Sequence, residues 1–548
     1  MKRRALAILS AVMLLAGCAT MPTSGAPHQF AIDVPDREPI GQLGSGPRVG
    51  TSEEQLVEDF LRACAAGAFD DYATARLYLL PSVADTWQPT SQVTVFPTDK
   101  MPSPMLEDSD SGTTDVLLEV PTMATVDAAG VLNEYSKTQD TPLVFRLALN
   151  ESGEWRIAAL QDGLVLSQSS FKTGFVQNNL YFPSASEETL VADPRWVPRL
   201  RVSSHLTQGL LAGPSPNLEG AVAQNVADGL TLPTGGVEVR DRVAYVELEG
   251  QLSSDPEVRS LLQWQMAQTL RQSSDVQVVV VSVNGFELDP ESVPSAPELV
   301  LDRVVAFRDG ALVSGSLQSP SSVAGITDVG QDPQLPAVGP YGASPYAWLA
   351  GEDRGELHVF ASPEAQFVHE GQWVSAPSVD PLGNVWAADA DGDIYFFEGG
   401  AEDALQVPLT FSDDKVSKVS VAPDGARIVL LAGRSVWIGT IVYDSDGKPT
   451  IRALAPEERL TGATVDVTWS SQTSLVALVG PEDAREVVGA PVGAFQTTYN
   501  APTNTVRVAG GAAGTGVLVQ RADQFLFRRV GAGWREVGDA LAYIATAS

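Results

Sequence analysis

Alternating carboxylates around a glycine are the residues most able to bind a metal in this sequence. They occur at Asp389–Asp393 and again at Asp444–Gly447. Calcium loops use alternating side-chain oxygens of this kind, but an EF-hand also needs a bidentate glutamate further on, and neither stretch has one at that spacing. Both stretches lie between strand-like runs, where the chain needs a hairpin turn. A turn is therefore the favoured interpretation, calcium binding stays an alternative, and we predict no metal site.

Catalytic groups are sparse. The four histidines are His28, His205, His358 and His369, and the His-Glu pair at 369 lacks the second histidine of a zinc-protease helix. No serine lies in a Gly-x-Ser-x-Gly elbow. The glycine-rich stretch Gly510–Gly516 lacks the lysine of a phosphate-binding loop, and a propeller turn explains it better. We therefore predict no catalytic residue and no cofactor, which favours a binding protein over the alternative, an envelope hydrolase.

The cysteine at position 18 has the clearest chemical role. Lys2–Arg4 is a short cationic start, and Ala5–Leu15 is an apolar run that is too short to span a membrane but suits a signal peptide. The run ends in Leu15–Cys18, which resembles a bacterial lipobox. We predict a signal peptide over residues 1–17 and lipid attachment at Cys18, on the extracytoplasmic face of the cell membrane. More than one acyl chain makes such anchoring stable. An ordinary signal peptide with a chance cysteine is the alternative.

The charge balance excludes several partners. Removing the three cations of the signal peptide leaves 32 basic and 68 acidic residues, a net charge of −36. A chain this acidic is repelled by nucleic acid and by anionic lipid. The covalent lipid must therefore hold it to the membrane. Solubility alone also explains the acidity. Cys64 is the only other cysteine, which precludes a disulfide once Cys18 is acylated, and it is predicted to be a core residue of a helix.

The elements after Cys18 form a tether and a first α+β unit. Residues 18–50 are predicted to be a flexible tether, because Met21–Gly50 is rich in proline and glycine without periodicity. Residues 51–183 are predicted to begin with a helix from Ser52 to Gly67 and a second helix over Tyr72–Leu80. The strands predicted to follow are Val93–Phe96, Val116–Val126, Leu143–Leu149 and Trp155–Leu160. This order resembles the cone-shaped NTF2-like folds.

A second α+β unit is predicted over residues 184–290. Its predicted elements are a helix over Pro198–Leu211, a hairpin of Val237–Val239 and Val243–Leu248, a helix over Asp255–Gln272 and a strand over Val276–Val283. The Asn284-Gly285 pair predicts a tight hairpin turn after the strand. With Leu210–Pro214 before the hairpin, this order resembles the GerMN domain over Arg195–Leu288. The resemblance implies an extracytoplasmic module of sporulation, germination and envelope lipoproteins.

Residues 297–548 are predicted to be an all-β propeller. Val379–Trp386 aligns with Val421–Ile428, and looser copies recur at offsets of about 40 to 46 residues, the period of a four-stranded blade. A blade cannot bury both faces alone, so the copies must close into a ring. The strand Leu299–Phe307 is predicted to close it against the last blade, near Phe525–Val530. The number of blades stays open, and a β-sandwich is the alternative.

The order of lipobox, NTF2-like unit, GerMN unit and C-terminal propeller resembles the LpqB family of actinobacterial lipoproteins. The resemblance covers essentially the whole mature chain. It implies an accessory regulator of a two-component sensor kinase of the MtrA–MtrB type, linked to envelope homeostasis and cell division. The partner implied is the extracellular domain of the sensor histidine kinase. No family motif adds a site residue to Cys18. An envelope hydrolase or a ligand-binding propeller protein is the alternative.

Overall fold

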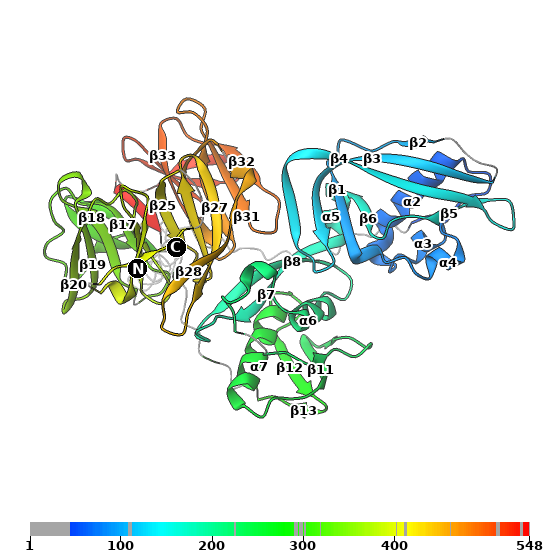
Figure 1. Cartoon of the computed structure of the whole chain (residues 1–548), viewed down its shortest axis with the longest axis horizontal. Coiled ribbons are helices and arrows are strands. Elements are labelled where there is room, and N and C mark those ends of the chain that lie inside the picture. Colours follow the sequence, from blue (N-terminus) through cyan, green and yellow to red (C-terminus); the bar gives the residue numbers. More distant parts are fainter. Residues whose placement is uncertain are drawn as a thin grey trace, which may run out of the picture. The chain divides into compact units, whose positions relative to one another are not determined.

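The structure is a computed structural model, and it combines two α+β parts with an all-β part (Figure 1). It describes residues 44–107, 112–223, 226–289, 294, 300, 303–317, 319–342, 344–401, 403–409, 414–460, 462–510, 516–537 and 541–546. The predicted fold class is confirmed. The predicted signal peptide, Cys18 and most of the predicted tether lie outside the described residues. In the part of the chain that is described, no helix is both long and apolar enough to cross a membrane.

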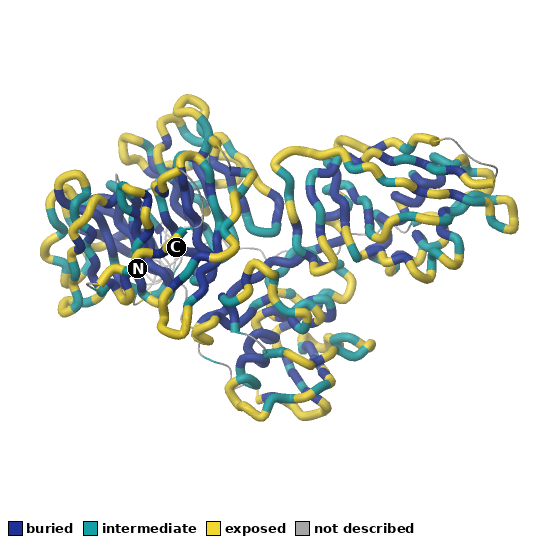
Figure 2. The backbone as a smooth tube through the Cα atoms, viewed as in Figure 1, coloured by how far each residue is buried: buried dark blue, intermediate teal, exposed yellow. Residues whose placement is uncertain are grey.

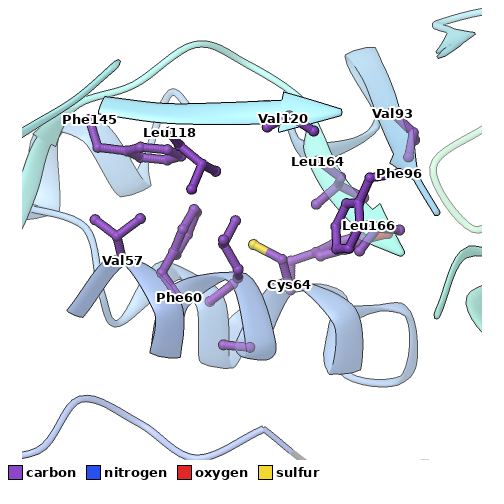
Figure 3. Close-up of a cluster of buried hydrophobic side chains, with 14 of the residues drawn as sticks. Val57, Phe60, Cys64, Val93, Phe96, Leu118, Val120, Phe145, Leu164 and Leu166 are labelled. Carbon is purple, nitrogen blue, oxygen red and sulfur yellow. The ribbon is translucent and has the colours of Figure 1, made fainter. Parts of the chain in front are cut away.

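The first helix of the N-terminal domain, α2 (Glu53–Ala66), begins where the sequence predicts. The Ser52 side chain accepts a hydrogen bond from the Gln55 backbone N–H at 3.4 Å, and acidic residues occupy the first turn, where they favour the positive end of the helix dipole. The apolar side of the helix is buried. Figure 3 shows Val57, Phe60 and Cys64 pointing from this helix into a cluster of buried side chains. The capping residue and the helical spacing therefore fix this element.

The second predicted helix, over Tyr72–Leu80, is wrong beyond its first turn. Only α3 (Ala73–Arg76) is helical, and Tyr72 before it has a left-handed φ of 61°. The backbone then becomes extended and pairs with a strand. The Ile157 N–H donates to the Tyr78 carbonyl at 2.9 Å, and the Leu80 N–H donates to the Ile157 carbonyl at 2.9 Å. A sheet edge that needed a partner outweighed the local helical pattern.

A twisted sheet packs against α2 in the N-terminal domain. Its strands are β1 (Gln92–Phe96), β2 (Pro104–Leu106), β3 (Thr113–Asp127), β4 (Leu132–Leu149), β5 (Trp155–Ala159) and β6 (Leu164–Ser167). The order is β5-β4-β3-β1-β6, with β2 beside β3, and only the β1–β6 pairing is parallel. Along β3, every second residue is buried, which directs Leu118 and Val120 toward α2 (Figure 3). The short helices are α4 (Pro81–Ala84), α5 (Gln168–Gly174), η1 (Gly67–Phe69) and η2 (Pro89–Ser91). The NTF2-like resemblance stays a prediction.

The middle domain is a sheet covered by two helices. Its elements are β7 (Phe175–Pro183), β8 (Leu190–Pro198), α6 (Val202–Ala212), η3 (Pro216–Leu218), β9 (Leu230–Thr231), β10 (Glu238–Arg240), β11 (Val243–Gly250), α7 (Pro256–Leu270), β12 (Val278–Val283) and β13 (Phe286–Glu287). The strands run β10-β11-β12-β13, with β9 also on β11, while β7 and β8 form a separate hairpin. The predicted hairpin, second helix and strand are confirmed. Asn284 and Gly285 have φ of 50° and 79°, as a tight hairpin turn requires. The domain boundaries themselves stay predictions.

Six four-stranded antiparallel sheets form the propeller in the described part of the chain. The first blade comprises β14 (Arg303–Arg308), β15 (Ala311–Ser316), β16 (Ser321–Ser322) and β37 (Ala542–Thr546), and the second comprises β17 (Gln334–Val338), β18 (Tyr346–Ala350), β19 (Glu356–Ser362) and β20 (Ala365–Glu370). The third comprises β21 (Ser378–Val379), β22 (Val385–Ala388), β23 (Ile394–Phe397) and β24 (Leu405–Val407), and the fourth comprises β25 (Val416–Val421), β26 (Arg427–Ala432), β27 (Ser435–Tyr443) and β28 (Pro449–Pro456). The fifth comprises β29 (Thr464–Ser471), β30 (Ser474–Val479), β31 (Glu486–Pro491) and β32 (Thr497–Asn500), and the sixth comprises β33 (Thr505–Ala509), β34 (Leu518–Arg521), β35 (Leu526–Val530) and β36 (Gly533–Glu536). Short helical turns are η5 (Glu352–Arg354), η6 (Glu398–Gly400) and η7 (Glu458–Leu460). In Figure 2, the blade strands are largely buried and the turns between them are exposed.

The ring closes through β14 and β37. Val304 lies opposite Thr546, and Val305 lies opposite Ala545, so the C-terminal strand completes the first blade. The prediction that a strand within Leu299–Phe307 closes the ring is confirmed, but its predicted partner near Phe525–Val530 is wrong. That segment forms β35, which already has β34 and β36 as neighbours and therefore has no free edge.

In one copy of the sequence repeat, the buried Asp380 orders a turn and links neighbouring blades. The Asp380 carboxylate accepts hydrogen bonds from the Leu382 and Asn384 backbone N–H groups, both at 2.9 Å, and from the Trp386 indole at 3.1 Å. The Tyr443 hydroxyl of the next blade donates to the same carboxylate at 3.2 Å. Burial raises the pKa of Asp380, and the hydrogen bonds from Trp386, Asn384 and Tyr443 oppose that shift. The repeat is therefore structural, because one side chain orders a turn and joins two blades.

Candidate binding sites

The cysteines and histidines are the residues that the sequence analysis considered for chemistry. Cys18 and His28 lie outside the described residues. Within the described ranges, no group of three or more His, Cys, Asp or Glu side chains could hold a metal ion. Cys64 is 2% exposed, and burial raises the pKa of its thiol. Burial, together with nearby Arg201, lowers the pKa of His205. The His358 Nε2 lies 2.7 Å from a carboxylate oxygen of Glu356, a polar contact between residues of the same strand.

Both aspartate-glycine stretches are hairpin turns. Asp389 Oδ1 accepts from the backbone N–H groups of Asp391 at 2.9 Å and Asp393 at 3.0 Å, and the turn joins β22 to β23. Asp444 Oδ1 does the same for residues two and four positions on, both at 2.9 Å, between β27 and β28. The first carboxylate of each stretch therefore orders its own turn, as aspartate commonly does. The hairpin interpretation is confirmed.

The Leu210–Pro214 motif forms the end of α6 and one wall of a cavity. Gly213 has a φ of 93°, which ends the helix. The cavity has a volume of about 460 Å³, and Phe182, Val222 and Gln265 contribute to its other walls. This volume lies in the range of small-molecule pockets, of roughly 300–1,000 Å³. The motif that is most distinctive in sequence is therefore a helix stop beside a cavity.

The middle domain presents one face of its sheet without a covering helix from its own fold. We call the side chains of Val243, Tyr245, Val278 and Val280 the open face. The register pairs Val243 with Val278 and Tyr245 with Val280, so these four lie together, and all are half-buried or exposed. The alternate residues of β11 and β12 are buried in the core that α6 and α7 complete (Figure 1).

A cation rims the open face. The Arg240 guanidinium lies 4.9 Å from the centre of the Tyr245 ring, and its Nε is 3.1 Å from a Glu238 carboxylate oxygen. Tyrosine and arginine beside aliphatic side chains are the residue types that carry binding energy in protein interfaces. The open face therefore suits contact with another protein.

Charged side chains line the propeller axis, and sequence reasoning missed them. Lys418, Asp466 and Arg507 occupy the corresponding place in three successive blades, each just after a β-bulge in the strand nearest the axis. Bulges redirect side chains, and they are frequent next to functional sites. A sequence signal did exist, because each charged residue is followed by valine. We call these three residues the axial triad.

Family models match three successive segments of the chain. "Lipoprotein LpqB, N-terminal domain" matches residues 46–172, "Sporulation and spore germination" matches 179–289, and "Lipoprotein LpqB beta-propeller domain" matches 310–543. Lipoprotein LpqB of Nocardia farcinica (strain IFM 10152) is 25% identical over 87% of this chain and 85% of its own. Lipoprotein LpqB of Streptomyces coelicolor (strain ATCC BAA-471 / A3(2) / M145) is 28% identical over 86% of this chain and 85% of its own.

Among solved structures, a streptogramin B lyase resembles 38% of this chain over 70% of its own, at 12% identity and a TM-score of 0.30. A likeness of that size carries no argument about activity. The conclusions below therefore rest on the matches to families and relatives.

Proposed function

Because the chain belongs to the LpqB family of lipoproteins, we propose that it is a lipid-anchored regulator that contacts the extracytoplasmic domain of a two-component sensor kinase. The predicted lipid on Cys18 supports this role, since it would confine the protein and the kinase to one membrane surface. Confinement raises the effective concentration, so that a weak contact suffices. The proposed kinase is of the MtrA–MtrB type, and the proposed processes are envelope homeostasis and cell division.

The open face of the middle domain is the contact that we propose, and it is the single observation on which the assignment of a surface rests. Val278 is 46% exposed and lies opposite Val243 of β11. Covering an exposed apolar side chain that lies beside a tyrosine and an arginine stabilises the complex with the partner.

The regulatory effect follows from differential affinity. A partner shifts an on–off equilibrium of the kinase only by the difference in its affinity for the two states. A coupling of roughly 1 to 3 kcal/mol changes the ratio of the states by about 5- to 150-fold. A modest surface that favours one kinase conformation is therefore sufficient, and no chemical step by this chain is required.

The test compares two matched substitutions in cells that lack the gene. Val278→Asp places a charge on the open face, whereas Val368→Asp places the same charge at a 55% exposed valine on the propeller strand β20. Phosphorylation of the response regulator is measured during division and under envelope stress. We expect wild type and Val368→Asp to restore the wild-type level, and Val278→Asp to leave it as in the deletion strain.

Two outcomes contradict the proposal at different levels. If deletion of the gene leaves regulator phosphorylation unchanged, the kinase role fails. If deletion has an effect but Val278→Asp restores it fully, the role stands and the open face is not the contact. Capture of the purified kinase extracellular domain by each variant measures binding directly. If both variants melt at the wild-type temperature, failure of Val278→Asp to capture the domain means loss of the contact and not misfolding of the variant.

A further inference from the structure

The acidic member of the axial triad is already saturated by other donors. Lys418 Nζ donates to Asp466 Oδ1, which also accepts from the Val467 backbone N–H at 3.1 Å. Asp466 Oδ2 accepts from the Val508 backbone N–H at 2.9 Å. Lys418 and Asp466 therefore neutralise each other, and Asp466 also ties the fifth blade to the sixth.

Arg507, the third member, is left with donors to spare. A guanidinium carries five N–H donors in a planar fork. Within the described part of the chain, the Arg507 side chain makes no hydrogen bond, and its guanidinium carbon lies 5.2 Å from the centre of the Tyr543 ring. Burial lowers the pKa of Arg507, and the Asp466 charge offsets this shift only in part. A partly buried cation is thus held at the axis without an acceptor of its own.

The cavity that Arg507 faces has room and a second free donor. Its volume is about 50 Å³, against the roughly 10–15 Å³ that one water needs on the same measure. Ser420 also lines it, is 3% exposed, and has no hydrogen-bond partner for its hydroxyl among the described residues. Pro336 and Ala376 lie along the same cavity, where their small side chains leave space. A buried hydroxyl left unpaired costs free energy until it finds a partner.

We propose that the propeller axis binds a small oxyanion, a carboxylate or phosphate group, with Arg507 as its main donor and the Ser420 hydroxyl as a second. The guanidinium fork matches both groups in shape, and hydrogen bonds to it are charge-assisted. With Lys418 and Asp466 paired, the axial triad carries one net positive charge in a chain whose formal charge is −33. The cavity admits a group rather than a large molecule. This site is independent of the kinase contact.

The experiment is isothermal titration calorimetry on the purified full chain in a neutral detergent. Sodium acetate and sodium phosphate are titrated separately, at an ionic strength held constant with chloride. We expect saturable one-site binding of at least one of the two anions. Arg507→Gln should weaken it at least tenfold, whereas Arg535→Gln, on the exposed outer strand of the same blade, should leave it unchanged. Binding of acetate alone identifies a carboxylate site, of phosphate alone a phosphate site, and of both a general oxyanion site.

A second variant tests the charge argument in case Arg507→Gln unfolds. Asp466→Asn removes the one negative charge of the axial triad and keeps one side-chain oxygen as an acceptor for a backbone N–H group. We expect it to bind the anion more tightly than wild type, a change that a purely structural role of the triad would not produce. Absence of saturable binding to either anion, or equal affinities of wild type and a folded Arg507→Gln, would overturn the proposal.

Discussion

At the scale of single residues, burial decides what Cys64 can do. Its thiol lies in the core between α2 and the sheet, where a charge is poorly solvated, and nearby Asp70 adds to the same effect (Figure 3). The pKa of the thiol is therefore raised, and the thiolate, which is the nucleophilic form, does not accumulate near neutral pH. Cys64 is a packing residue, as its helical spacing predicts.

Cys64 should resist alkylation until the chain unfolds. In a Cys18→Ala chain, iodoacetamide at about pH 8 should leave the native protein almost unmodified and label one thiol in guanidinium chloride. Mass spectrometry measures the label. Cys64→Ser should cost about 1–3 kcal/mol of unfolding free energy, because a hydroxyl replaces the thiol in an apolar site. Rapid labelling of the native chain would instead mean that the helix opens easily.

Residue chemistry was predictable wherever a local pattern determines it. The aspartate turns at Asp389 and Asp444 follow from turn residues between strands, and both are found. The axial triad was not predictable in the same way, because Lys418, Asp466 and Arg507 lie in separate repeats and meet only once the ring has closed. Which way each side chain points depends on a bulge in strand pairing, and a single sequence does not record that register.

At the scale of elements, local signals fixed the helices better than the partners of the strands. The N-cap at Ser52 and the apolar face predicted α2, and the Asn284-Gly285 turn predicted the end of β12. The error at Tyr78–Leu80 and the wrong partner predicted for the ring-closing strand β14 share one cause. In both, a backbone segment took the partner whose edge was free, and the partner was remote in sequence. Non-local pairing of this kind overrides local propensity.

Strand β37 should be essential for a folded propeller. A chain that stops after Leu541 leaves β14 with an unpaired edge beside the buried side chains of the first blade, and such edges aggregate. We expect it to elute as large species in size-exclusion chromatography and to lose its cooperative melting transition. A chain that stops after Thr546 retains every residue of β37 and should behave as the full chain does. A monomeric, cooperatively melting chain without β37 would contradict the closed ring.

At the scale of the whole molecule, the strong acidity opposes association with an anionic membrane, whereas the predicted lipid favours it. Without the predicted signal peptide, the net charge is −36, which would repel an anionic bilayer surface, so membrane residence would depend on the acyl chains predicted at Cys18. The family is one of lipoproteins, and the anchor itself is our prediction. Anchored in this way, an acidic protein would stand away from the lipid headgroups, with its domains open to other envelope components.

Replacement of Cys18 should abolish the anchor, whereas replacement of the other cysteine should not. We expect Cys18→Ala to incorporate no labelled fatty acid and to retain its signal peptide, since the thiol is the acyl acceptor. Cys64→Ala should be labelled and should fractionate with the membrane as wild type does. Labelled fatty acid followed by gel electrophoresis gives the result directly. Equal labelling of all three chains would refute acylation at Cys18.

The pairing of β14 with β37 also determines when the first blade can finish folding. β37 follows every other propeller strand in the chain, so the first blade stays one strand short until the strands of the other blades have been synthesised. Joining ends so far apart costs loop-closure entropy, and contacts between remote segments form slowly. Lipid would be added at Cys18 long before that moment. The cell would thus hold, on the surface of its membrane, a tethered and unfinished ring that envelope proteases can inspect. A chain cut short just before β37 would stay in that state.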